Sequence, residues 1–366
     1  MKRICLSCLI LMLVAFNVNS QKWSYFLEGK GIHDITEDKN GNIWAATYDD
    51  GAYMISGNNV KEFNEKNGLS WSSLKAVYVD SKNNVWIGTG KTKITADGKG
   101  VCIYDGSKWK YFTEKDGLAS DAVFSFFEDS KGRMWSGTAK GICLLKGEKW
   151  VTIDSISPSR FTAPAFFEDK TGNVWFMYEG GVFKYGNNGL KTFDSSSGLA
   201  LKQTLSWTID KEGAIWFGHV RRHFSKFSND KFETFDVGNF KAGALILFTG
   251  AYLYEPVRVY SDSRGYLWIA AMGAGGGLFH LKNGELTQIN EKDGVQKPER
   301  IGRISEDKRG NIWFSNMWKS ANRYDGTKWY QYSTPELPDV QVNTLFIDSK
   351  DNIWFGTHKG LAKLEQ

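Results

Sequence analysis

Arginine, histidine and aromatic side chains that could bind a ligand are concentrated between residues 219 and 318. The segment HVRRH joins two histidines and two arginines, and a later apolar stretch contains two nearby tyrosines. Tyrosine and tryptophan rings stack on the C–H faces of sugars, and arginine forks bind carboxylate or sulfate groups. We therefore predict a site for a glycan or another small anionic ligand. Its residues are His219, Arg221, Arg222, Tyr252, Tyr254, Arg258, Arg300, Arg303, Asn316 and Trp318.

A purely structural interpretation of these residues stays open. The connection DVGNFKAGALILFTGAYLYEPV is longer than its counterparts elsewhere in the chain and strongly apolar. A long apolar connection is expected to fold onto another surface. It could fill the centre of the fold without binding a ligand, and the arginines could pair with neighbouring carboxylates.

No catalytic or metal-binding motif is present. The sequence lacks the GxSxG and HExxH patterns, and its five histidines do not have the spacing of metal ligands on a helix. We therefore expect no metal and no cofactor, and a binding protein is favoured over an enzyme. His358 and Glu179 could reach the same face of the fold, which keeps an enzymatic alternative open.

The elements that must position the site are repeats. A small polar turn followed by tryptophan recurs eight times, at intervals of 40 to 52 residues. Each unit reads as four short strands joined by turns rich in Asp, Asn and Gly, which supply the positive φ of tight hairpins. Four antiparallel strands in each unit of this length indicate the blade of a β-propeller. The anchors are Trp44, Trp86, Trp135, Trp175, Trp216, Trp268, Trp313 and Trp354.

The two ends of the repeat array complement each other. The chain ends at a third strand, GLAKLEQ, and KWSYF near its beginning resembles a fourth strand such as KWKYF. We expect an all-β, eight-bladed propeller of four-stranded blades, in which the N-terminal strand joins the last blade. This arrangement closes the ring and removes exposed strand edges.

The repeated residues have structural roles in this interpretation. Each anchor tryptophan should pack between neighbouring blades, where a large ring buries most area. Acidic residues before the turns, such as Asp38 and Asp129, should cap the turns, because one such motif offers too few oxygens for Ca²⁺. Cys102 and Cys143 occupy equivalent positions on adjacent blades, too far apart for a disulfide. We expect two buried free thiols.

The repeat GLASDAVFSFFEDSKGRMWSGTAKGI resembles the two-component regulator propeller family. The matching residues are Gly117, Leu118, Val123, Glu128, Asp129, Gly132, Trp135, Gly137, Thr138 and Gly141. The resemblance extends over residues 21–366, although blades five to seven depart from the pattern. It implies a sensor-type propeller of the kind that binds extracellular ligands, often glycans, for a membrane-bound kinase. We expect this chain to be the propeller alone.

The first twenty residues predict export. A basic start, MKR, precedes a short apolar run, and Val18 and Ser20 suit a signal peptidase. We therefore expect a signal peptide over residues 1–20, a single propeller domain of eight repeats over residues 21–366, and a periplasmic or secreted location. The apolar run is shorter than the roughly 20 residues of a membrane span, so we expect none in the mature chain.

Charge and composition narrow the class of partner. The formal charge is +5, and +3 once Lys2 and Arg3 are removed, without a basic run. Nucleic acid is therefore not an expected partner. The leading hypothesis is a non-enzymatic ligand-binding propeller. The alternatives are a scaffold for a membrane or envelope protein, and a propeller lyase similar to streptogramin or polysaccharide lyases, since GNIWFSN resembles the GxIWFT phrase of streptogramin lyases.

Overall fold

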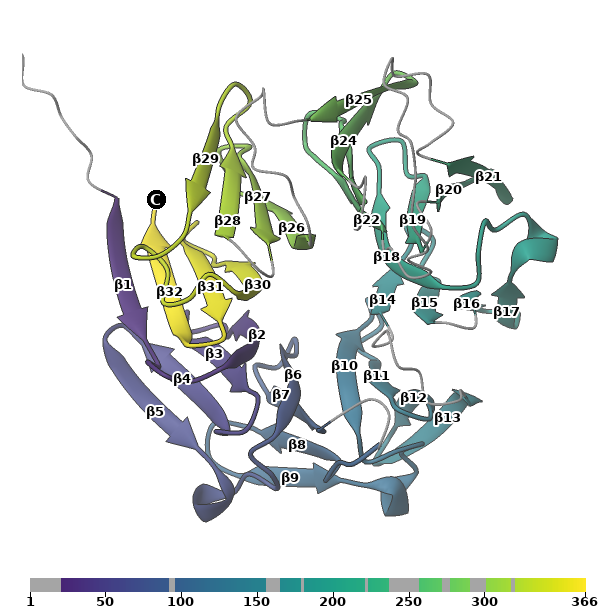
Figure 1. The fold of residues 1–366 in the computed structure, drawn as a ribbon. Helices are drawn as coiled ribbons and strands as arrows, with labels where there is room; N and C mark the ends of the chain where they lie inside the picture. The colour runs from purple at the N-terminus through teal and green to yellow at the C-terminus, as the bar shows by residue number, and fades with distance from the viewer. Residues whose placement is uncertain are drawn as a thin grey trace, which may run out of the picture.

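The computed structural model describes residues 21–91, 96–155, 165–178, 181–220, 223–236, 257–271, 277–289, 301–316 and 320–366. In these residues the strands form eight four-stranded antiparallel sheets. Figure 1 shows the sheets as blades around a central opening. The first strand of each blade lies at the inner edge of the ring. The prediction of an eight-bladed propeller is therefore confirmed.

The strands follow one order in every blade. Blades one to four are β2 (Ile32–Glu37), β3 (Ile43–Thr47), β4 (Ala52–Ser56), β5 (Asn59–Phe63); β6 (Leu74–Val79), β7 (Val85–Thr89), β8 (Val101–Tyr104), β9 (Trp109–Phe112); β10 (Val123–Glu128), β11 (Met134–Thr138), β12 (Gly141–Lys146), β13 (Lys149–Ser155); β14 (Ala165–Glu168), β15 (Val174–Tyr178), β16 (Gly181–Gly186), β17 (Gly189–Phe193).

Blades five to eight are β18 (Thr204–Ile209), β19 (Ile215–His219), β20 (His223–Ser228), β21 (Lys231–Asp236); β22 (Val257–Ser261), β23 (Leu267–Ala271), β24 (Gly277–Lys282), β25 (Glu285–Ile289); β26 (Ile301–Glu306), β27 (Ile312–Asn316), β28 (Ser320–Tyr324), β29 (Trp329–Tyr332); β30 (Val342–Ile347), β31 (Ile353–Thr357), β32 (Gly360–Glu365) and β1 (Lys22–Phe26). Three short 3-10 helices lie in the described connections between blades, at Glu65–Asn67, Glu114–Asp116 and Ser195–Ser197.

The N-terminal strand closes the ring. β1 pairs antiparallel with β32, from Lys22 opposite Glu365 to Phe26 opposite Leu361, and the two strands lie side by side in Figure 1. The Trp23 ring lies 5.7 Å from the rings of Tyr332 and Phe355, which belong to blades seven and eight. The predicted closure is therefore confirmed.

Each anchor tryptophan is held by the aspartate six residues before it. The indole Nε1 donates to a carboxylate oxygen at 2.7 to 3.0 Å in all eight blades of the described structure. The other carboxylate oxygen accepts backbone N–H groups of the turn, for example those of Asn40 and Asn42 at Asp38. The predicted turn cap is confirmed, and the indole bond adds a second role. The aspartates are Asp38, Asp80, Asp129, Asp169, Asp210, Asp262, Asp307 and Asp348.

The tryptophan rings and both cysteines are part of the core. Trp86 of blade two packs in one apolar cluster with Val123 and Phe126 of blade three, as expected for packing between blades. Cys102 and Cys143 are free and buried, which confirms the two thiols. Backbone N–H groups of the connections before their blades donate to the sulfur atoms, from Ser70 at 3.4 Å and Ala119 at 3.2 Å.

Two kinds of polar contact join neighbouring turns. Where the residue five before the anchor is serine, its N–H and hydroxyl both donate to a glutamate of the next blade, as Ser81 does to Glu128. Where it is lysine in blades one and seven, its N–H donates to the next turn, as Lys39 does to Asn83 at 2.7 Å. The serine contacts are Ser81–Glu128, Ser130–Glu168, Ser263–Glu306 and Ser349–Glu37.

Candidate functional site

Three charged side chains occupy the same level of the inner strands. Asp34, Arg258 and Arg303 each lie ten residues before the anchor tryptophan of their own blade. They belong to β2, β22 and β26, the first strands of blades one, six and seven. Because these strands form the inner edge of the ring (Figure 1), the repeat places the three residues at equivalent positions of inner strands.

Arg258 is a cation without a counter-ion in the described structure. Its Nη1 donates to the carbonyl oxygen of Leu205 on the neighbouring first strand. Its Nε is buried and has no hydrogen-bond partner among the described residues, and burial lowers the pKa of its guanidinium. A desolvated charge is costly unless an opposite charge and hydrogen bonds compensate it. This environment therefore favours an anion beside Arg258.

Arg303 and Asp34 interact across blade eight. Asp34 accepts the N–H groups of Ile35 at 3.0 Å and Val77 at 3.2 Å. Burial raises the pKa of Asp34, and the positive charge of Arg303 opposes this increase. Arg303 itself is exposed. Its guanidinium is therefore accessible to a ligand, while the carboxylate of Asp34 is fixed by backbone donors.

His219 and Asn316, two of the predicted site residues, are buried inside their blades. Each is the third residue after its anchor, a position where Thr47 and Thr138 donate to a carbonyl of their own hairpin. His219 is fully buried, and Asn316 is 1% exposed. This position points into the blade and not into the loop, which is why both side chains are enclosed.

Hydrogen bonds engage both nitrogens of the His219 ring. Nδ1 lies 3.0 Å from the hydroxyl of Thr204, and Nε2 lies 2.9 Å from that of Ser225. Burial, with a smaller contribution from the charge of His223, lowers the pKa of His219 to about 3. The ring is therefore neutral at physiological pH and is part of the hydrogen-bond network of blade five.

The remaining predicted site residues lie outside the described residues: Arg221, Arg222, Tyr252, Tyr254, Arg300 and Trp318. Glu179, the suggested partner of His358 in an enzymatic alternative, lies outside them too. Among the predicted residues, the structure thus places Arg258 and Arg303 on adjacent inner strands, and it buries His219 and Asn316 elsewhere in their blades.

A second group, which the sequence analysis missed, lies at blades eight, one and two. We call His33, Tyr48, Lys75 and His358 the Tyr48 cluster. The Tyr48 ring lies 5.0 Å from that of His33 and 6.0 Å from that of His358. The Nζ of Lys75 lies 5.0 Å from the Tyr48 ring centroid. The Nζ of Lys91 lies 5.4 Å from the ring centroid of Trp71.

Burial changes the acid–base properties of this cluster. It lowers the pKa of Lys75, an effect opposed by the charge of Asp49, and raises the pKa of Tyr48. The cluster thus combines aromatic faces with a partly desolvated ammonium group. The sequence contained one signal for it, because blade one has YDDG where blades three and eight have AKG and HKG in the same loop.

The described ranges contain neither a candidate metal site nor a membrane-spanning helix. In these ranges no group of three or more His, Cys, Asp or Glu residues could hold a metal ion. Among the same residues, no helix has the length and apolar character needed to cross a bilayer.

The fold and the inner-edge charges define the class of protein as an eight-bladed β-propeller with charged residues on three of its inner strands. Residues 27–49, 117–140 and 336–359 match the family described as two component regulator propeller. The chain therefore carries three repeats of the two component regulator propeller family, in blades one, three and eight. All three matched segments lie outside blades five to seven, which are the blades that depart from the repeat pattern. No curated protein sequence matches the chain.

Solved structures share the fold at low sequence identity. The extracellular domain of the putative hybrid two component system BT3049 from B. thetaiotaomicron has 22% identity and a TM-score of 0.55 over 91% of this chain. This chain spans about half of that domain, 51% of its length.

Two further solved structures come from proteins of other kinds. Virginiamycin B lyase from Staphylococcus aureus has 15% identity and a TM-score of 0.54, over 94% of this chain and 99% of the lyase. PorZ, a surface component of the type-IX secretion system of Porphyromonas gingivalis, has 15% identity and a TM-score of 0.56, over 88% of this chain and 51% of PorZ. At these identities the likeness concerns the fold alone.

Proposed function

We propose that this protein is an exported, non-enzymatic propeller of the sensor type that binds an anionic glycan or another small anionic ligand at the central opening. The observation that carries the proposal is the guanidinium of Arg258, whose buried Nε has no hydrogen-bond partner and which has no counter-ion in the described structure. An anionic group of a ligand would supply both the missing charge and the missing acceptor.

The neighbouring residues suit the rest of such a ligand. Arg303, on the adjacent first strand, adds a second, exposed guanidinium. The Tyr48 cluster offers an aromatic face and an ammonium group on which a sugar ring could stack and hydrogen-bond. Arg221, Arg222, Tyr252, Tyr254, Arg300 and Trp318 remain part of the proposed site as predicted from sequence.

Export rests on the leader-like residues 1–20 and on the kind of protein that shares the fold. The BT3049 structure is that of an extracellular domain, and such a domain meets ligands outside the cell. We therefore place this protein in the periplasm or outside the cell, where glycans and glycan fragments are available.

A glycan screen of the purified protein tests the proposal. Ligands found on an array of neutral, uronate and sulfated glycans would be titrated by calorimetry against the wild type and Arg258→Met. Removing a charge-assisted hydrogen bond of about 1.5–3 kcal/mol predicts affinity weaker by roughly 10- to 100-fold. Anionic ligands should lose affinity and neutral ligands should not.

The matched control is Arg323→Met. The Arg323 guanidinium also has a buried, unsatisfied Nε, but it stacks on Tyr330 at 4.1 Å and belongs to the third strand of blade seven. This variant should bind as the wild type does. Equal affinity of wild type and Arg258→Met for every ligand found would reject the site.

A further inference from the structure

The connections between blades normally cover the outer strand of the following blade. In three described connections a 3-10 helix is followed by a glycine in the left-handed region and then by a buried leucine. Gly68 lies so close to Trp109 that a Cβ would come within 2.3 Å of its ring. The glycine thus packs directly on the outer strand.

A side-chain hydroxyl of the outer strand donates a hydrogen bond to the carbonyl oxygen of this glycine. Tyr111, the residue before the last one of β9, donates to the oxygen of Gly68 at 2.6 Å. Thr234, which like Tyr111 directly precedes a phenylalanine of its outer strand, donates to the oxygen of Gly198 at 2.9 Å. The same contact, a side-chain hydroxyl on a main-chain carbonyl, therefore recurs at different places around the ring.

The connection into the last blade lacks this glycine. Leu337 is buried like Leu69 and Leu118. The N–H of Leu337 donates to the carbonyl oxygen of Ser333, four residues earlier, whereas the N–H of Leu118 donates to that of Thr113, five residues earlier. The turn is thus one residue shorter, and the missing residue is the one whose carbonyl the hydroxyl holds elsewhere.

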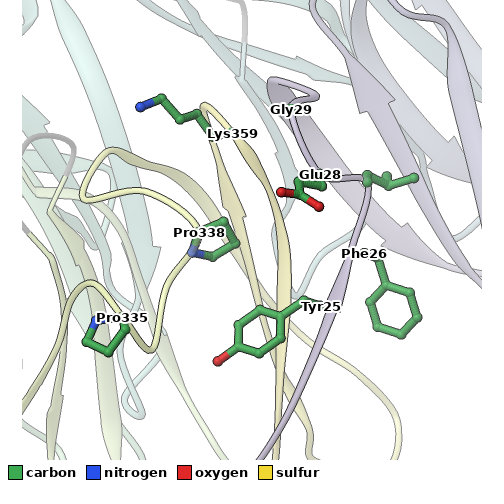
Figure 2. Close-up of a pocket in the computed structure, with 8 residues that line it drawn as sticks. Tyr25, Phe26, Glu28, Gly29, Pro335, Pro338 and Lys359 are labelled. Carbon is green, nitrogen blue, oxygen red and sulfur yellow. The ribbon is translucent and has the colours of Figure 1, made fainter.

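Tyr25 of β1 occupies the position of Tyr111 and has no such partner. Its ring is 55% exposed, and its hydroxyl forms no hydrogen bond with the described residues. A groove of about 630 Å³ opens beside it, lined by Tyr25, Phe26, Leu27, Glu28, Gly29, Pro335, Pro338 and Lys359. Figure 2 shows the Tyr25 ring on the side of the strand that faces Pro335 and Pro338.

The geometry points to a docking site in this groove for a short extended peptide segment of a partner protein, with a main-chain carbonyl of that segment accepting from the Tyr25 hydroxyl. Two other junctions supply the chemistry, because there the same strand position binds a peptide carbonyl of the chain itself. Aromatic side chains are also the surfaces on which extended, polyproline-like peptides pack. Glu28 and Lys359 give the groove a charge of each sign for orienting the segment.

A displayed library of random peptides provides the probe. Peptides selected on the purified wild-type protein would be labelled and titrated by fluorescence polarisation against Tyr25→Phe, Tyr25→Ala and Tyr111→Phe. Loss of one hydrogen bond of about 1 kcal/mol predicts roughly five-fold weaker binding to Tyr25→Phe. Tyr25→Ala should remove measurable binding, and Tyr111→Phe, the matched change in another blade, should leave it intact.

The outcomes are distinct from those of the glycan screen. Arg258→Met should bind the selected peptides as the wild type does, since Arg258 lies on an inner strand and Tyr25 on an outer one. Because the Tyr25 ring is exposed, unchanged thermal unfolding of Tyr25→Ala would show that it folds. Three results would each overturn the inference. The library could yield no enriched peptide, or the selected peptides could bind both Tyr25 variants as tightly as the wild type. Tyr25→Ala could also lose affinity for a glycan and keep its affinity for the peptides.

Discussion

At the residue scale, the third position after the anchor separates blade five from the standard repeat. Thr47, Thr89, Thr138 and Thr357 each donate to a carbonyl oxygen of the loop that follows. His219 instead spans from Thr204 to Ser225. A threonine is satisfied within its own hairpin, whereas the histidine connects three strands of the blade. The histidine makes the stability of blade five sensitive to acid, because a protonated imidazole ring cannot accept a hydrogen bond.

We expect His219→Thr to reduce the loss of stability in acid. The folded pKa of about 3 lies below the usual histidine value of 6.5, so the unfolded state binds the proton first. The stability from a neutral His219 is complete above pH 6.5 and falls as the pH is lowered towards 3. Between pH 7 and pH 5 the wild type should lose about 2 kcal/mol through this group.

Urea unfolding at the two pH values would measure this difference. His219→Thr should be less stable than the wild type at pH 7, because the hydrogen bond between the ring and Ser225 is lost, but its stability should change less on acidification. His358→Thr is the control, since His358 is exposed and should leave the pH dependence unaltered. An equal decrease for wild type and His219→Thr would contradict the assignment.

At the scale of the elements, the turns at the ends of the first strands join the blades in pairs. Within the described structure, every serine five residues before the anchor tryptophan donates hydrogen bonds to a glutamate of the next blade. No lysine at this position does so among the described residues. A serine N–H and hydroxyl together fit the two oxygens of one carboxylate. The blades with lysine at this position precede blades that have Val79, Ile209, Ser261 or Ile347 in place of the glutamate. The N–H and ammonium groups of Lys308 therefore find separate acceptors, Asp351 and Ser349.

The contact between Ser349 and Glu37 is expected to help close the ring. A double-mutant cycle of Ser349→Ala and Glu37→Ala should give a coupling energy of about 1 kcal/mol, because each oxygen of Glu37 accepts one bond from Ser349. The control cycle combines Ser349→Ala with Glu128→Ala, whose contact is in another part of the ring. Equal coupling in the two cycles would show that the pairing carries no specific energy.

At the scale of the whole molecule, stability depends on joining the two ends of the chain. Two residues of β1 supply rings that fill the last blade: Trp23 packs towards blade seven, and Phe26 lies 5.6 Å from Trp354. Without β1 the edge of β32 would be free to pair with another chain. The N-terminal strand is therefore a part of the last blade and not a peripheral addition.

Trp23→Ala should lower the free energy of unfolding by about 2–3 kcal/mol, since it removes a large, half-buried ring from the last blade. Hydrogen exchange should then accelerate in β1 and β32 together, and less in the strands of blade four. Lys22→Ala is the control, because its ammonium group is mostly exposed and its ion pair with Glu365 is a surface contact. Unchanged exchange in β32 would contradict this role of β1.

The sequence by itself determined the blades, their number and the closure of the ring. The aspartate, the turn and the tryptophan of each repeat lie within seven residues, so their hydrogen bonds are local and recur with the sequence pattern. The complementary chain ends are likewise visible as strand motifs. Arg258 and Arg303 could be selected because they depart from that pattern.

Only the tertiary structure decided which departures meet and which are buried. Tyr48 and His358 are at opposite ends of the chain, and ring closure alone brings their side chains together. The burial of His219 and the missing counter-ion of Arg258 depend on what the neighbouring strands supply. Local patterns specify a blade, because its contacts are between residues close in sequence, whereas a binding surface of a propeller is made by contacts between blades.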